Sequence, residues 1–160
     1  MKTAIIYYSY DGNCARTAEL MKAALNASVF EIKTVDTKRR KGFYMILWGV
    51  LQVMRKKKPA LQSLTVDISA YDLIILGTPV WAGAPAPAIA SFLDGTKISG
   101  KKIALFCCHR GGPGDVFKKF RAMLQGNTIA GEIDFFSPPK GGMPELQQKI
   151  DEWVKLISQP

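Results

Sequence analysis

Three short stretches of this sequence carry the residue types of ligand-binding loops, and each follows an apolar run. The first is residues 9–14, Ser-Tyr-Asp-Gly-Asn-Cys, directly before an amphipathic pattern. A glycine-containing loop at the start of a helix presents unpaired N–H groups and the positive end of the helix dipole, which suits a phosphate group. The same residues also suit a tight strand-to-helix turn in which Asp11 or Asn13 caps the helix. The loop alone favours neither interpretation.

The second stretch, residues 77–87, contains two glycines and three prolines around Trp81. A large aromatic side chain on such a restricted loop can stack on a planar ring while backbone amides contact the edge of that ring. The alternative is that Trp81 folds inward and packs in the core.

The third stretch, residues 108–114, has three glycines in its last four positions, so its backbone can approach a ligand closely. It also contains His109, the only histidine, beside Arg110. A solitary loop histidine is usually a solvated hydrogen-bonding group, but beside a bound ring it is a candidate proton donor or ring contact. Arg110 is either solvated or placed to stabilise negative charge on a ligand.

The sequence lacks the residues for a metal site, a catalytic triad, a nucleotide-binding P-loop or a phospho-receiver site. Cys14, Cys107 and Cys108 form no Cys-x-x-Cys motif and no His/Cys cluster, so we expect no metal site. A Ser-His-Asp arrangement cannot be assembled from the spacing, and the motif Gly-x-x-x-x-Gly-Lys-Ser/Thr is absent. Asp11 alone does not make the acidic cluster of a phospho-receiver domain. We expect no catalytic acid or base.

The elements that must position these loops follow from alternating apolar runs and helical patterns. Five runs are predicted to be strands: residues 3–8, 28–33, 71–77, 102–108 and 128–136. Helical patterns cover residues 13–27 and 116–124 and begin at Pro85 and Pro144. This alternation predicts βαβ units, and hence a three-layer α/β/α sandwich around a five-stranded parallel sheet. Ligands of such sheets bind at the carboxyl ends of the strands, which is where all three loops fall.

The composition is that of a folded protein. The chain has 160 residues, of which 48% are hydrophobic and 22% charged, which excludes a disordered chain, a collagen-like fibre and a coiled coil. With no internal repeat or linker, residues 1–160 are predicted to be a single domain. The odd set of three cysteines indicates reduced thiols, and polar Ser9 and Asp11 come too early for a signal peptide. We therefore expect a cytoplasmic location.

Residues 37–63, after the second predicted strand, form an unusual insert. The net charge is +9, and eight basic residues with no acidic one lie between Lys38 and Lys58, so the rest of the chain sums to +1. Between the two basic clusters, residues 43–54 are almost entirely apolar. They predict a helix about 18 Å long, which is too short to cross a bilayer.

The three loops, in this order, resemble the FMN-binding loops of short-type flavodoxins. Residues 9–14 resemble the phosphate loop Ser-x-Thr-Gly-Asn-Thr, residues 78–83 resemble the second flavin loop, and residues 111–114 match the third in position. The last predicted strand lacks the interrupting loop of long-type flavodoxins. The resemblance implies a sheet in the order 2-1-3-4-5, with FMN held non-covalently at the carboxyl ends of strands one, three and four.

The resemblance also implies which residues contact FMN. The first loop would hold the phosphate, Trp81 would cover one face of the ring, and the second and third loops would follow its edges. The cofactor-binding residues expected from it are Ser9, Tyr10, Asp11, Gly12, Asn13, Cys14, Thr78, Pro79, Val80, Trp81, Ala82, Gly83, Cys108, His109, Arg110, Gly111 and Gly112. Asp11 and Cys14 stand where the family has threonine, so two phosphate-binding hydroxyls are lost. A carboxylate at Asp11 would repel a phosphate if it pointed inward.

Three functions agree with these residues. The first is a carrier of electrons between redox partners, and the second is an FMN-dependent NAD(P)H or quinone reductase. The third is a flavin-free α/β binding module, in which Asp11 and Cys14 have ended flavin binding. The oligomeric state is left open.

Three roles agree with the insert. Its charges can be solvated and flank a helix packed on the sheet, or they can dock an acidic redox partner. The helix can instead lie on anionic lipid, anchored by Tyr44 and Trp48, which would make the protein peripheral to a membrane. Nucleic acid is not expected, because the aromatic and basic residues stand in separate blocks rather than interleaved.

Overall fold

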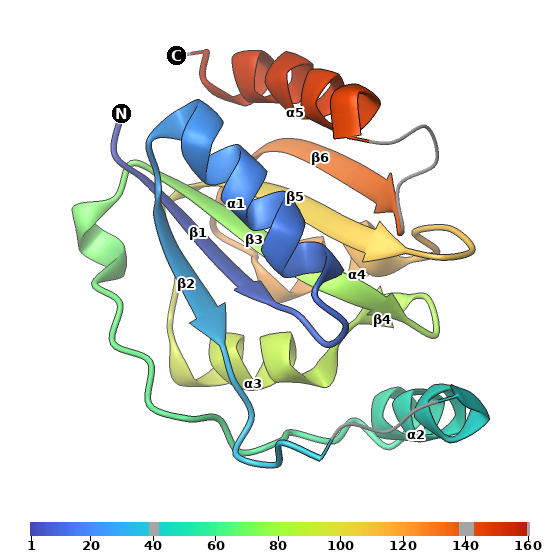
Figure 1. Cartoon of the computed structure of the whole chain (residues 1–160). Coiled ribbons are helices and arrows are strands. Elements are labelled where there is room, and N and C mark those ends of the chain that lie inside the picture. Colours follow the sequence, from blue (N-terminus) through green and yellow to red (C-terminus); the bar gives the residue numbers. More distant parts are fainter. Residues whose placement is uncertain (39–41, 138–142, 160) are drawn as a thin grey trace.

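The computed structural model describes residues 1–38, 42–137 and 143–159 (Figure 1). Its sheet contains five parallel strands in the order β2-β1-β3-β5-β6. The bounds of these strands are β1 (Thr3–Tyr8), β2 (Ser28–Ile32), β3 (Leu73–Trp81), β5 (Lys102–His109) and β6 (Thr128–Phe136). Numbered along the chain as predicted, this is the order 2-1-3-4-5 of a flavodoxin-like α/β fold.

The expectation of a purely parallel five-stranded sheet is wrong at one point, because the sheet has a sixth strand. β4 (Ala84–Pro85) pairs antiparallel with the end of β3. β3 continues past its predicted end to Trp81, and the chain reverses at Ala82 and Gly83, whose φ values are 47° and 67°. Two successive positive φ angles suit the tight turn of a twisted hairpin. Pro85, expected to open a helix, therefore lies in β4.

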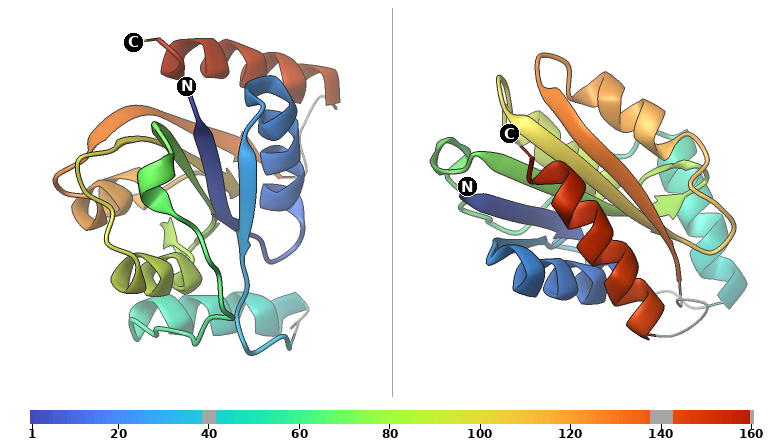
Figure 2. Two further views of the ribbon diagram at one scale, coloured as in Figure 1. Left: turned by 90° about the vertical axis from the view of Figure 1, so that its left-hand side faces the viewer. Right: turned by 90° about the horizontal axis from the view of Figure 1, so that it is seen from above.

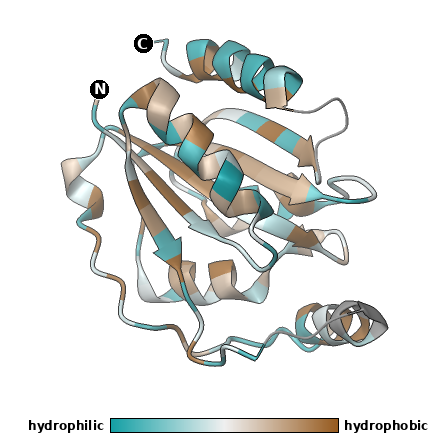
Figure 3. Ribbon diagram, viewed as in Figure 1, coloured by the Kyte–Doolittle hydropathy of each residue, from teal (hydrophilic) through white to brown (hydrophobic). Residues whose placement is uncertain are grey.

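Helices cover both faces of the sheet (Figure 2). α1 (Asn13–Leu25) and α5 (Met143–Ile157) pack on one face, and α3 (Pro87–Gly95) and α4 (Val116–Met123) pack on the other. Successive residues of β1 alternate between the two cores: Ile5 and Tyr7 face α1 and α5, whereas Ile6 and Tyr8 face the opposite layer. The central strands are thus mostly apolar on both faces, while the covering helices mix apolar and polar residues (Figure 3). Among the described residues, no helix is long and apolar enough to cross a membrane.

The insert contains one long helix, α2 (Gly42–Met54), and the short 3₁₀ helix η1 (Ile68–Ala70) precedes β3. α2 lies beyond α3, at the opposite side of the molecule from α5 (Figure 1). The two ends of the insert are joined in a narrow neck, in which the N–H of Val35 donates to Ala60 at 2.9 Å and the N–H of Gln62 donates to Lys33 at 2.8 Å. Part of the first basic cluster, residues 39–41, lies outside the described residues.

Candidate functional site

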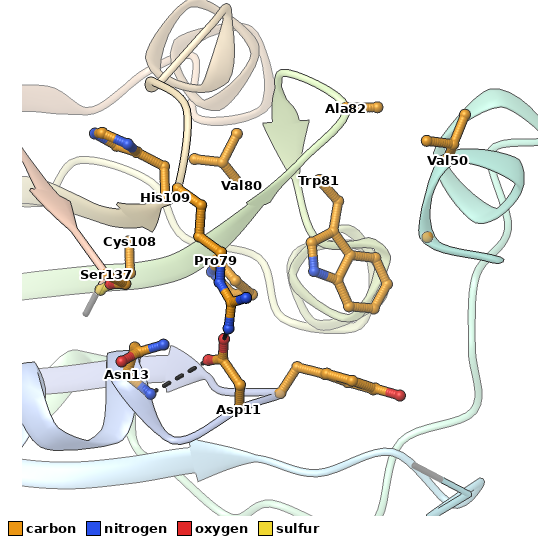
Figure 4. A pocket seen from close by; sticks show the side chains of 13 residues that line it. Asp11, Asn13, Val50, Pro79, Val80, Trp81, Ala82, Cys108, His109 and Ser137 are labelled. Carbon is orange, nitrogen blue, oxygen red and sulfur yellow. Dashed lines mark hydrogen bonds and ion pairs between the residues drawn. The ribbon is translucent and has the colours of Figure 1, made fainter. Parts of the chain in front are cut away.

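A pocket of about 250 Å³ lies where the carboxyl ends of β1, β3 and β5 meet (Figure 4). All three predicted loops contribute to its lining. The contributing residues are Tyr10, Asp11 and Asn13 from the first loop, Pro79, Val80, Trp81 and Ala82 from the second, and Cys108, His109 and Arg110 from the third. Gly49 and Val50 of α2, and Ser137 after β6, complete the lining. Sequence reasoning placed none of these last three in the site.

The remaining expected residues do not line the pocket, and several of them hold its walls instead. This group comprises Ser9, Gly12, Cys14, Thr78, Gly83, Gly111 and Gly112. Thr78 is fully buried, and its hydroxyl accepts from the N–H of Ala86 at 2.9 Å and donates to the carbonyl of Pro79 at 3.0 Å. Thr78 thereby ties β3 to the residue after β4, so its contribution to a ligand is indirect.

The first loop caps its helix with glycine rather than with a side chain. Gly12 is the N-cap of α1, with a φ of 90° in the left-handed region, and its carbonyl accepts from the N–H of Arg16 at 3.0 Å. Neither Asp11 nor Asn13 takes that position. A side chain at this φ would be strained, which explains the glycine.

Two N–H groups of the first turn already bind side chains of the same loop. The N–H of Asn13 donates to Asp11 Oδ1 at 3.3 Å, and the N–H of Ala15 donates to the buried Ser9 hydroxyl at 3.3 Å. The first-turn N–H groups of a helix are the donors that an anion would use. The Ser9 hydroxyl therefore accepts from the N–H of Ala15, which a bound phosphate would otherwise use.

Asp11 places a negative charge at this helix N-terminus. Its second carboxylate oxygen lies 3.5 Å from a guanidinium nitrogen of Arg110, which reaches across from the third loop. The carboxylate thus has one hydrogen bond from the helix and one cation beside it, the two kinds of group that hold a phosphate. The N–H groups of the first turn and the guanidinium of Arg110 fit an anion. The carboxylate of Asp11 already occupies part of this site.

Trp81 lies between the pocket and the insert. Its ring makes edge-on contacts with Tyr8, Tyr10 and Trp48, with centroid distances of 6.1, 5.6 and 5.3 Å. Gly49 of α2 lies so close that a Cβ there would be 3.6 Å from the indole. Trp81 is half-buried, so one part of it lines the pocket while another packs against α2.

The second and third loops are held together by their glycines. The carbonyl of Gly83 accepts from the N–H of Asp115 at 3.1 Å and from the ammonium of Lys119 at 3.3 Å. A Cβ on Gly114 would lie 2.7 Å from the Cα of Gly83, so this approach is open only to glycine. The hairpin that carries Trp81 is therefore fixed against the start of α4.

His109 takes part in a contact with β6. Its Nε2 lies 2.9 Å from Asp134 Oδ2, and its ring meets Phe136 edge-on at a centroid distance of 6.0 Å. The ring is turned away from Asp11 and Trp81 (Figure 4). Nδ1 is buried and has no hydrogen-bond partner in the described part of the chain. The geometry favours a positioning role for His109 over the expected contact with a ring.

Two thiols lie close together here: Cys108 lines the pocket, whereas Cys14 does not. Cys14 is fully buried, and burial raises the pKa of its thiol well above the ordinary value. A hydrogen bond with Cys14 lowers the pKa of the Cys108 thiol, with a further contribution from Thr17, whose hydroxyl lies 3.6 Å from the sulfur. Cys14 therefore packs inward, and the described residues hold no group of His, Cys, Asp and Glu that could bind a metal.

The residues of the pocket fit FMN in chemical type. An anion site stands at the start of α1, and aromatic side chains of Tyr10 and Trp81 form an adjacent wall. The walls come from the carboxyl ends of the central strands, where parallel sheets bind their ligands.

Comparison with known proteins supports FMN as the cofactor. The family model for NADPH-dependent FMN reductase matches residues 1–127. A flavoprotein from Lactobacillus acidophilus NCFM, solved in complex with FMN, is 28% identical, with a TM-score of 0.73 over 83% of this chain and 92% of that one. A putative flavoprotein from Bacteroides uniformis ATCC 8492 is 20% identical, with a TM-score of 0.79 over 96% of this chain and 97% of that one.

Like the Bacteroides uniformis protein, one further structure below 25% identity shows the fold alone. Oxidised Flavodoxin 2 from Bacillus cereus is 19% identical, with a TM-score of 0.59 over 99% of this chain and 98% of that one. No curated protein sequence matches this chain.

Proposed function

Because this chain belongs to the NADPH-dependent FMN reductase family, a family of flavodoxin-like FMN-binding proteins, we propose that it carries electrons between redox partners on a bound FMN. The observation that supports this proposal is the pocket itself. Residues from three loops, far apart in the sequence, line one cavity at the carboxyl ends of β1, β3 and β5. Bound FMN supplies the electron chemistry, while the protein supplies binding and orientation.

Each loop then has a distinct task. The first turn of α1 and the guanidinium of Arg110 would hold the phosphate, in competition with the Asp11 carboxylate that now contacts both. Trp81 and Tyr10 would provide an apolar wall for the ring, and Pro79, Val80 and Ala82 would line the pocket beside it.

The size of the pocket supports a carrier. A cavity of about 250 Å³ is smaller than the roughly 300–1,000 Å³ that encloses a drug-sized ligand. A molecule as large as FMN would stay partly exposed there. An exposed edge is what electron exchange with a second protein requires.

A second candidate is an FMN-dependent reductase that takes electrons from NADPH. A cavity of about 400 Å³ lies on the insert side of Trp81, so this one side chain lines both cavities. Lys57 and Lys58 line this cavity, and because the ammonium of Lys58 pairs with Asp94, Lys57 is the cation that can meet a phosphate of a dinucleotide. A substrate beside the flavin would have room there.

Two measurements test the proposal and separate the candidates. Titration of the purified protein with FMN is expected to shift the flavin absorbance and quench its fluorescence. The saturated protein is then mixed with NADPH without any partner: a carrier oxidises none in the steady state, whereas a reductase does. A flavin spectrum that stays that of free FMN would contradict both and favour a flavin-free binding module.

A further inference from the structure

The outer side of α2 exposes a continuous apolar stripe. Tyr44, Leu47, Leu51 and Met54 are 77%, 44%, 37% and 73% exposed, and their spacing of three, four and three residues places them on one face of a helix. The inner side is occupied, since Gly49 meets Trp81 and Val50 lines the pocket. The stripe is thus the face that the fold leaves uncovered.

Positive charge flanks this stripe, and no negative charge offsets it within the insert. The sequence has no Asp or Glu from Thr37 to Val66. Arg55 and Lys56 are exposed directly after α2, while the ammonium of Lys58 pairs with Asp94 of α3. At the other end Lys38 is exposed, and residues 39–41, which are basic in the sequence, lie outside the described residues.

Lys56 stands where a glycine would be favoured. Its φ is 46°, and the end of α2 is closed by hydrogen bonds from the N–H of Lys56 to Val53 and from the N–H of Lys57 to Gln52, both at 3.0 Å. This is the pattern of a helix C-terminus whose left-handed residue is usually glycine. Lys56 therefore has a strained backbone, and its side chain places a positive charge two residues after Met54.

We propose that α2 is an interfacial helix that binds the surface of an anionic phospholipid membrane. Its apolar stripe would enter the boundary between headgroups and acyl chains, with the basic side chains at its ends among the lipid phosphates. Stable attachment takes two signals, an apolar anchor and a basic cluster, and the insert places both together: the stripe lies on α2, and Arg55 and Lys56 follow directly after it.

The shape and charge of this surface favour lipid over two other occupants. Three side chains of the stripe, Tyr44, Leu47 and Leu51, line an open hollow together with Trp48. A folded protein would need a shape that matches this uneven surface, whereas a fluid bilayer adapts to it. A second copy of this chain would place the same patch on both sides of a two-fold axis and bring like charges together. The partner that suits this surface is therefore a membrane, in which mobile anionic headgroups surround an apolar layer.

Vesicle flotation of the full chain tests the proposal. Binding is expected to vesicles of phosphatidylcholine mixed with phosphatidylglycerol, and to be weaker by about tenfold or more on phosphatidylcholine alone. Leu47→Gln with Leu51→Gln should weaken binding by about tenfold or more, because two apolar side chains lose their burial. Arg55→Gln with Lys56→Gln should weaken it by about thirtyfold at low salt, and by less at high salt.

The matched control lies on the other side of the molecule. Leu156 and Lys155 of α5 are exposed in the same way, so Leu156→Gln with Lys155→Gln changes the same chemistry away from α2. That variant should bind anionic vesicles as the parent does. Circular dichroism and thermal unfolding check that each variant is folded, and the exposed Arg55 and Lys56 provide a test that leaves the apolar packing intact.

Three results would overturn the proposal. One is equal binding of parent and α2 variants to anionic vesicles. Another is a stable dimer in solution that Leu51→Gln converts to monomer, which would assign the stripe to a second copy. The third is no vesicle binding together with salt-sensitive binding to an acidic protein that requires Arg55 and Lys56. Since flotation involves no flavin measurement, its failure is distinguishable from a failure of the FMN proposal.

Discussion

The imidazole of His109 is held by Asp134, with 2.9 Å between Nε2 and Oδ2, so the only histidine of the chain joins the end of β5 to β6. In the parallel pairing of β5 with β6, Cys107 lies opposite Asp134 and His109 lies opposite Phe136. The contact lies beside the pocket and fixes the strand end that carries Cys108 and Arg110 into it. It therefore acts on the site through the backbone.

Removal of this contact should reduce stability more than FMN affinity. His109→Ala is expected to lower the free energy of unfolding by about 1.5–3 kcal/mol, the usual range for a hydrogen bond to a charged group. The dissociation constant for FMN should change by less than about threefold. Urea unfolding and a fluorescence titration measure the two quantities, and Asp134→Ala should reproduce the stability loss without adding to it in the double variant. A large loss of affinity at full stability would make His109 a ligand contact.

Asp11 should weaken FMN binding, because its carboxylate occupies an anion site. Asp11→Thr removes the charge and restores the hydroxyl of the family pattern, and we expect about tenfold tighter binding at low salt. The gain should shrink as salt is added. Asp11→Asn is the control for charge alone, since it keeps the shape and an acceptor for the N–H of Asn13. Weaker binding by both variants would show that the turn depends on the Asp11 carboxylate.

Trp81 and Trp48 should differ in their effect on FMN although they share a contact. Trp81→Ala removes a pocket wall and should weaken FMN binding by about 1–3 kcal/mol, the range for stacking on a base. Trp48 does not line that pocket, so Trp48→Ala should change the affinity less. Both should increase hydrogen exchange in α2, whose packing rests on their contact at 5.3 Å. Equal losses of affinity would mean that the position of α2, rather than the indole of Trp81, sets FMN binding.

Tyr7 should make the fold sensitive to alkali. Burial, with Glu31 and Glu19 nearby, raises the pKa of its phenol from 10.0 to about 12. The neutral phenol is thus favoured in the folded state, and its contribution is complete below pH 10 and lost as the pH rises through about 12. Urea unfolding across this window should show a steeper loss of stability for the parent than for Tyr7→Phe. Parallel curves would assign the alkaline loss to other groups.

The parallel strands and the three loops could be predicted because each depends on a local pattern, whereas the strand order followed only from the resemblance of the loops to those of flavodoxins. Apolar runs and helical spacing set the parallel strands, and glycine and proline mark the loops. The β3–β4 hairpin was missed because Pro79 and Pro85 argue against strands, yet both lie at a sheet end where a missing N–H is tolerated. Gly49 and Val50 reach the pocket only through the packing of α2, which no local pattern encodes. Ser137 follows β6 directly, so the rule that ligands bind at carboxyl strand ends could have found it.

The neck of the insert has a consequence for how this protein family can vary. Because Val35 is bonded to Ala60 and Lys33 to Gln62, the segment beyond them begins and ends at adjoining points. Each doubling of the length of such a loop costs only about 0.6 kcal/mol of closure entropy. Evolution can therefore lengthen, exchange or delete this segment without shifting the register of β1 or β2. Such a change would alter the surface that α2 exposes and the part of the pocket lined by Gly49 and Val50, while the five-stranded sheet and its three loops stay as they are.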